Sequence, residues 1–126
     1  MFKKFEDIEI WRSGRALVKQ IYALTAVGDF ALDRGLKDQI QRAAVSICSN
    51  VAEGFARNGN KDMARFLWIA KGSAAEVQSQ LYHACDIGYI DKKTFETLYS
   101  DLNKIQAALY RLIQSLSSTP SRQKLS

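Results

Sequence analysis

Apolar residues recur at alternating steps of three and four along most of this chain, which is the period of the α-helix. One run comprises Met63, Leu67, Ala70, Ala74, Val77, Leu81, Ala84 and Gly88. A second run comprises Phe95, Leu98, Leu102, Ile105, Leu109, Leu112 and Leu116. Seams of this spacing pack knobs-into-holes against a neighbouring helix. The only proline, Pro120, lies beyond both runs, so the pattern predicts long packed helices and no strand.

Capping and turn residues divide the chain into four helical segments. The first runs from Ile8 to Ala26, with Asp7 as its expected N-cap. After a turn at 27–30, Asp33 caps a second helix that ends near 58–59. Asn60 caps the third helix, Gly88 ends it, and Asp91 opens the last. The apolar positions of the first two segments are Ile10, Leu17, Ile21 and Leu24, then Leu36, Ile40, Ala44, Ile47, Val51 and Phe55.

Four amphipathic helices joined by short turns favour one fold, an all-α, antiparallel up-down four-helix bundle. We expect a single domain over residues 1–116, followed at 117–126 by a disordered, Ser-rich, basic tail. No stretch is apolar enough to cross a bilayer, and charged residues at the start argue against a signal peptide. Cys48 and Cys85 form neither a disulfide framework nor a zinc pattern. The sequence therefore predicts a cytoplasmic protein without membrane contact.

Catalytic and metal-binding patterns are weak. A di-iron bundle needs two Glu-x-x-His motifs and further carboxylates, whereas this chain has one histidine, His83, with Asp86 three residues later. A surface histidine with a helical neighbour explains that pair more simply than a metal ligand does. No serine or cysteine is marked as a nucleophile, and no glycine-rich phosphate motif is present. We expect no enzymatic activity, no metal and no cofactor.

The net charge of +5 is spread almost evenly along the chain. It leaves nucleic acid open as a partner without requiring it. Basic residues nevertheless form two short helical rows. The candidate nucleic-acid-binding residues are Arg12, Arg15 and Lys19 in one row and Arg57, Lys61 and Arg65 in the other. A solvated helix face explains either row alone, and a phosphate-binding surface explains both together.

The third helix carries a second stripe opposite its seam: Trp68, Gly72, Ala75, Ser79 and Tyr82. A solvated face would carry Lys, Glu and Gln at these positions. Large aromatics around small residues are instead typical of a surface that another helix approaches closely. We interpret Trp68, Gly72, Ala75 and Tyr82 as an oligomer interface, and scattered exposed apolar residues are the alternative.

Polar residues flank the seam of the second helix at Ser46, Asn50, Glu53 and Arg57. Such a row is typical of a hydrogen-bond network with a neighbouring helix, for which Ser73 and Glu76 are the candidate partners. A ligand site is the less common alternative.

Three segments, Phe5–Trp11, Gln39–Gly54 and Arg65–Ser73, resemble the bacterial family of large-subunit (23S) ribosomal RNA intervening-sequence proteins. The resemblance covers residues 5 to about 116. One departure is Cys48, which stands between Ile47 and Ser49 where the family commonly has proline. Whether the second helix bends there is left open.

This resemblance implies an up-down bundle that assembles into a homopentameric ring. The family is also similar to the accessory variability protein of diversity-generating retroelements, a basic pentamer that binds nucleic acid and a reverse transcriptase. The first functional hypothesis is therefore a non-enzymatic accessory module that binds RNA or DNA. The alternative is a ring-shaped protein-interaction scaffold with no nucleic-acid role.

Overall fold

The computed structural model describes residues 8–117, and this range contains five α-helices and no strand. The helices are α1 (Glu9–Leu24), α2 (Gly28–Leu32), α3 (Arg34–Phe55), α4 (Asn60–Ile87) and α5 (Lys92–Ser117). The expected all-α class is confirmed over these residues. The first seven residues and residues 118–126 of the predicted tail lie outside the described range, and Ser117, expected in that tail, is the last residue of α5.

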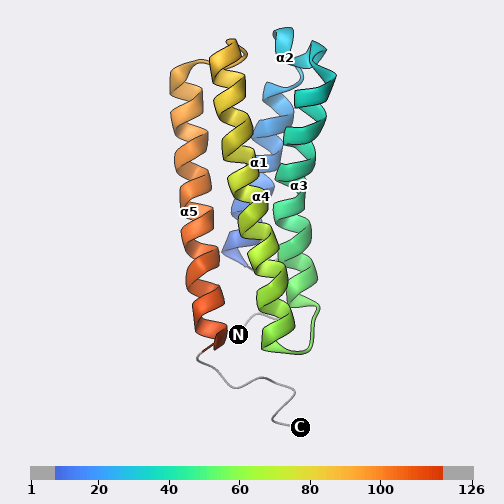
Figure 1. Cartoon of the computed structure of the whole chain (residues 1–126), viewed down its shortest axis with the longest axis vertical. Helices are drawn as coiled ribbons and strands as arrows, with labels where there is room; N and C mark the ends of the chain where they lie inside the picture. The colour runs from blue at the N-terminus through green and yellow to red at the C-terminus, as the bar shows by residue number, and fades with distance from the viewer. Residues whose placement is uncertain (1–7, 118–126) are drawn as a thin grey trace.

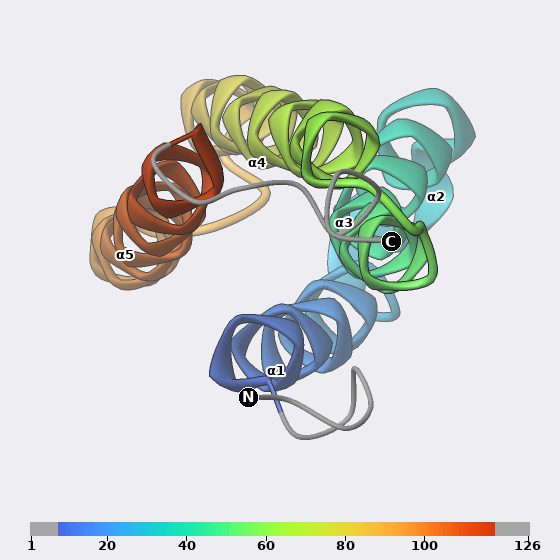
Figure 2. The same ribbon diagram turned by 90° about the horizontal axis from the view of Figure 1, so that it is seen from below.

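The four long helices lie alongside one another, and the chain reverses direction between consecutive ones (Figure 1). The short helix α2 sits at the end where α1 stops and α3 starts. Seen along the helices, α3 and α4 pack against each other, α5 lies beyond α4, and α1 lies beyond α3 (Figure 2). No helix among the described residues is long and apolar enough to cross a membrane.

The predicted seams form the core. In α4 the seam residues from Met63 to Ala84 are all buried, and Gly88 ends the helix with a left-handed φ of 94°. In α5, Leu98, Leu102, Ile105 and Leu109 are buried as expected. The next buried residue is Ile113, whereas Leu112 and Leu116 are only partly buried. The sequence prediction was therefore wrong by one position near the end of α5.

Helix boundaries also differ from the predictions. Helix α1 ends at Leu24 instead of Ala26, and the buried Thr25 hydroxyl donates a 2.9 Å hydrogen bond to the Ile21 carbonyl. The segment expected as a turn forms α2, which buries Phe30 beneath Tyr89 at a ring distance of 5.1 Å. The N-cap of α4 is Gly59, one residue before the predicted Asn60.

Asp33 caps α3 as predicted and also joins two turns at this end of the bundle. Its Oδ1 accepts a 3.1 Å hydrogen bond from the Leu36 amide. Its Oδ2 accepts a 2.9 Å hydrogen bond from the Tyr89 hydroxyl. The Leu36 amide is the larger of these two influences, and together they hold the pKa of Asp33 below its ordinary value of 3.8.

We expect acid to remove the stabilisation supplied by this carboxylate. Because the pKa of Asp33 is lower in the folded chain, its stabilisation is complete above pH 3.8 and is lost as pH falls through the folded value. Asp33→Asn keeps a capping side chain but has no charge to lose. Thermal melting at a series of pH values should therefore show a smaller acid-induced fall in Tm for Asp33→Asn than for the wild type. Equal falls in the two proteins would contradict a stabilising role of the ionised Asp33.

Candidate nucleic-acid and assembly surfaces

The stripe on α4 faces solvent. Trp68 and Tyr82 are 47% and 50% exposed, and Gly72, Ala75 and Ser79 between them are exposed as well. A Cβ built on Gly72 would meet no atom within 4 Å. The middle of the stripe is therefore a low, open surface bounded by two large aromatic side chains.

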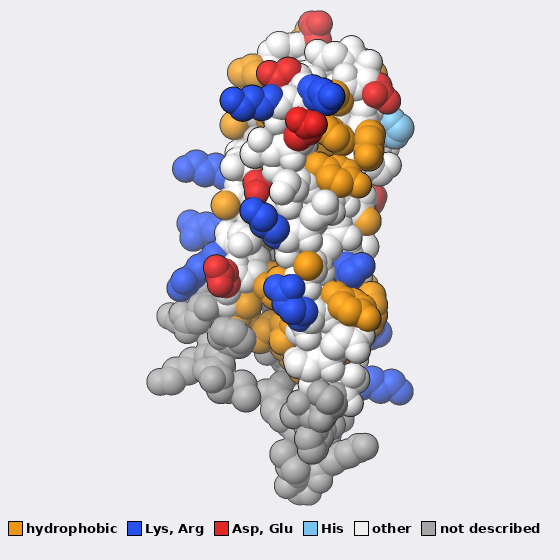
Figure 3. Space-filling view, turned by 90° about the vertical axis from the view of Figure 1, so that its left-hand side faces the viewer, with side chains coloured by type: hydrophobic (Ala, Val, Ile, Leu, Met, Phe, Trp, Pro, Cys, Tyr) orange, Lys and Arg blue, Asp and Glu red, His pale blue; other side chains and the backbone are white. Residues whose placement is uncertain are grey.

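Helix α5 extends the stripe with aromatic residues that sequence analysis did not assign to it. Tyr110 lies edge-on to Trp68 with ring centres 6.2 Å apart. Phe95 and Tyr99 lie 4.8 and 5.6 Å from Tyr82. Figure 3 shows hydrophobic side chains, in orange, gathered in patches on one face of the bundle. Phe95 was assigned to the core seam, and the spacing of Tyr99 and Tyr110 on the outer side of α5 was the available signal.

The first basic row lies on α1. Arg12, Arg15 and Lys19 are all exposed. The Arg15 guanidinium lies over the Trp11 ring, 5.8 Å from its centre. This cation–π contact holds the Arg15 side chain close to the helix, with its apolar stem packed beside the Trp11 ring.

The second basic row surrounds one aromatic ring. The guanidiniums of Arg57 and Arg65 each lie 4.6 Å from the centre of Phe66. Arg57 also forms a 2.6 Å ion pair with Glu53, and Arg65 a 3.1 Å ion pair with Asp62. The structure thus brings two of the three predicted cations together and places carboxylates beside them. Lys61 is exposed nearby at the start of α4. Phe66 was not identified from the sequence.

Part of the predicted polar row connects α3 to α4. The hydroxyls of Ser46 and Ser73 are 2.9 Å apart, and Asn50 Nδ2 donates a 3.0 Å hydrogen bond to Ser46 Oγ. Glu53 pairs with Arg57 instead, and Glu76 is exposed. Three of the residues therefore meet in one network, and the two glutamates lie outside it.

A second polar cluster, absent from the sequence analysis, joins α4 to α5. Gln78 Nε2 donates a 2.8 Å hydrogen bond to Asn103 Oδ1 and a 3.3 Å bond to the Tyr99 carbonyl. Gln106 Nε2 donates a 2.6 Å bond to Gln78 Oε1. Gln78 is buried, whereas Asn103 is exposed and Gln106 partly buried. The buried Gln78 amide helps to fix the relative position of the two helices, because it loses its partners if they shift.

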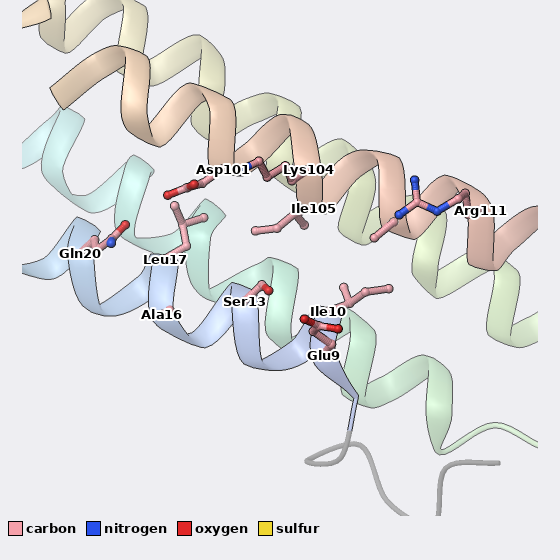
Figure 4. Close-up of a pocket in the computed structure, with 11 residues that line it drawn as sticks. Glu9, Ile10, Ser13, Ala16, Leu17, Gln20, Asp101, Lys104, Ile105 and Arg111 are labelled. Carbon is pink, nitrogen blue, oxygen red and sulfur yellow. The ribbon is translucent and has the colours of Figure 1, made fainter. Parts of the chain in front are cut away.

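A groove of about 490 Å³ lies between α1 and α5, where these helices diverge. Its base is apolar, with Ile10, Leu17 and Ile105, and its edges carry charged and polar side chains. Figure 4 shows Glu9 and Arg111 toward one end of the groove and Gln20 and Asp101 toward the other. This mixture of charges does not select one class of small ligand.

Helices α1 and α3 approach each other closely at Gly14 and Cys48. A Cβ on Gly14 would lie 2.9 Å from Cys48 Sγ, so a larger residue requires a local shift. Helix α3 is continuous through Cys48, the position at which the sequence analysis left a bend open. Burial raises the pKa of the Cys48 thiol to about 11 despite the nearby charge of Arg15. The thiol is therefore protonated near neutral pH and is a poor nucleophile.

His83 and Asp86, considered above as a metal pair, are both exposed on α4. Within residues 8–117, no group of three or more His, Cys, Asp and Glu side chains is placed to hold a metal ion.

Comparison with known proteins places this chain in a family. A family model described as "23S rRNA-intervening sequence protein" matches residues 6–111. One similar solved structure is a protein with unknown function from the S23 ribosomal protein family of Bacteroides thetaiotaomicron VPI-5482. It has 21% sequence identity and a TM-score of 0.75, covering 82% of this chain and 97% of that chain, and at this identity it supports the fold alone. No curated protein matches the sequence. The family match spans most of the chain, and the protein therefore belongs to the 23S rRNA-intervening sequence protein family.

Proposed function

We propose that this protein is a non-enzymatic, antiparallel up-down four-helix bundle that assembles with copies of itself and binds RNA or DNA as an accessory module. The description of its family links related proteins to an insertion in 23S rRNA. That link favours a nucleic-acid partner but does not identify it.

Assembly is supported by the exposed aromatic surface on α4 and α5. Aromatic residues are enriched at protein interfaces, and small residues between them allow a second helix to approach closely. The resemblance to a pentameric family suggests a ring of five subunits. In such a ring each cation occurs once in every subunit. Several weak contacts to one long nucleic-acid strand then form together, and the overall affinity exceeds that of a single subunit.

The arrangement of Arg57 and Arg65 around Phe66 is the observation that carries the binding proposal. Phe66 positions both guanidiniums at 4.6 Å, and Lys61 adds a third cation at the same end of α4. Arginine binds phosphate through a planar fork of donors, and a fixed position reduces the entropy lost on binding. The row on α1 supplies Arg12, Arg15 and Lys19 as further candidate contacts.

Neutralising the second row tests this function. We expect Arg57→Gln, Lys61→Gln and Arg65→Gln together to abolish binding of a labelled single-stranded RNA, measured by fluorescence anisotropy at low salt. Wild-type affinity should fall steeply with added salt, because each phosphate contact releases counterions. Circular dichroism and light scattering should show unchanged helicity and assembly.

The matched control is the double variant Arg57→Lys and Arg65→Lys. It keeps the charge and removes the guanidinium contacts with Phe66, so it should retain salt-dependent binding at reduced affinity. A wild-type protein that binds neither RNA nor DNA at low salt would exclude this function. The scaffold hypothesis would then predict a protein partner, and a reverse transcriptase is the first candidate that the family resemblance suggests.

A further inference from the structure

Charge is distributed unequally along the long axis of the bundle. The Ser46–Ser73 hydrogen bond and the Gly14–Cys48 contact mark similar levels on α1, α3 and α4. On α5 this level lies between Gln106, which bonds Gln78, and Tyr110, which packs on Trp68. We call residues 8–16, 46–73 and 107–117 the basic half, and residues 17–45 and 74–106 the opposite half. The basic half carries seven Lys and Arg against three Asp and Glu, whereas the opposite half carries seven against eight. Their net charges are therefore +4 and −1.

The charged residues are spread evenly along the sequence, which conceals the difference in net charge between the halves. Each long helix crosses both halves, so neighbouring segments of sequence contribute to both. In Figure 3 most of the acidic side chains on the visible face lie in the upper part of the view. The basic half is the end at which α1 begins and α5 stops (Figure 1). The fold, and not the order of residues, separates the charges.

The two halves act on a ligand almost independently at physiological salt. Helix α4 has 28 residues, and at 1.5 Å per residue it is about 42 Å long. The centres of the halves are therefore about 20 Å apart, which is twice the Debye length of about 10 Å at 0.1 M salt. Acidic residues of the opposite half do not cancel the field of the basic half at its own surface.

Two cations of the basic half are especially available. Lys61 and Arg111 are exposed, and neither forms an ion pair with another described residue. A 3.5 Å hydrogen bond from Asn60 Nδ2 to the Leu116 carbonyl joins the helix ends that carry them. Figure 4 shows Arg111 toward the end of the groove at which α1 begins. By contrast, Arg57 and Arg65 share their charge with Glu53 and Asp62.

We infer that the phosphate backbone of the nucleic acid engages the basic half alone, with Arg111 and Lys61 among its contacts, while the opposite half stays away from it. This inference rests on the proposed function and specifies which end of the bundle performs it. In a cyclic assembly all subunits are equivalent, so the basic halves lie at one level around the ring axis.

Two double variants with identical changes of net charge test the inference. One is Lys61→Glu with Arg111→Glu in the basic half, and the other is Lys92→Glu with Lys93→Glu in the opposite half. Lys92 and Lys93 begin α5, where a carboxylate suits the helix dipole, so the control should fold. Each variant is titrated as full-length protein against labelled single-stranded RNA over a range of salt concentrations.

We expect the basic-half variant to bind at least tenfold more weakly at about 0.1 M salt, where the Debye length is about 10 Å. The slope of log Kd against log salt should fall by about 0.7 for each lost contact with a single strand. At the same salt concentration the opposite-half variant should bind within about twofold of the wild type, since its charges lie beyond the screening length. Light scattering should give equal masses, and if the basic-half variant assembles differently, Arg111→Gln and Lys92→Gln repeat the comparison singly.

Equal weakening by the two variants would overturn the inference and leave the proposed function standing, because binding would then follow net charge alone. Stronger weakening by the opposite-half variant would reverse the assignment. A wild-type protein that binds no nucleic acid would instead exclude the proposed function, and the inference with it.

Discussion

Replacing Leu102 or Leu109 by alanine should lower the free energy of unfolding by about 2–5 kcal/mol in each case. Both side chains are fully buried on α5. Each substitution removes three carbon atoms from a closely packed core, and the cost rises with the volume of the cavity that the neighbours fail to fill. Urea titration followed by circular dichroism measures this change. Protein concentration must be held constant, because assembly makes apparent stability depend on it.

Leu32→Ala is the matched control for these substitutions. Leu32 is 79% exposed at the end of α2, so the same chemical change there should alter stability by less than about 0.5 kcal/mol. A loss below about 0.5 kcal/mol at both Leu102 and Leu109 would show that this face of α5 does not pack in the core.

Much of the fold follows from the period of the apolar residues. The α4 seam from Met63 to Ala84 is buried throughout, because its steps of three and four continue without interruption. Gly88 and Asp33 end and begin helices where their backbone and side-chain chemistry predicts. One error occurs where two adjacent apolar residues compete for the same core position. Ile113 is buried, whereas Leu112 packs only partly against the core, and tertiary packing alone decides between them.

The surfaces were less predictable, since they depend on contacts between helices. The sequence identified Trp68 and Tyr82 because they share one helix face. It did not identify Tyr110 beside Trp68, or Phe66 between two arginines, because those contacts need the three-dimensional arrangement. The axial charge imbalance was hidden for the same reason: the chain passes through both halves of the bundle several times.

The exposed stripe predicts a large change in mass when it is altered. We expect wild-type protein to scatter light as an assembly near five times 14.2 kDa. Gly72→Arg with Ala75→Glu should reduce the mass to that of a monomer. A Cβ on Gly72 meets no atom within 4 Å in the chain itself, so the arginine can be accommodated without disturbing the fold. In an interface, however, two bulky charged side chains would occupy the space between the helices, and the loss of their hydration would exceed the gain from pairing with each other.

Thr97→Arg with Ser100→Glu is the matched control. Both residues are exposed within α5, the two substitutions have the same three-residue spacing, and neither pair changes the net charge. This control should keep the wild-type mass, and all three proteins should keep their helicity.

The monomeric variant should also bind RNA weakly, because each bundle then offers only one set of cations and avidity is lost. A wild-type protein that is monomeric at micromolar concentration would remove the interface interpretation, and Trp68 and Tyr82 would then remain solvent-exposed residues on a single bundle. An assembly that survives Gly72→Arg with Ala75→Glu would instead require another face, and the groove between α1 and α5 is the next surface to alter.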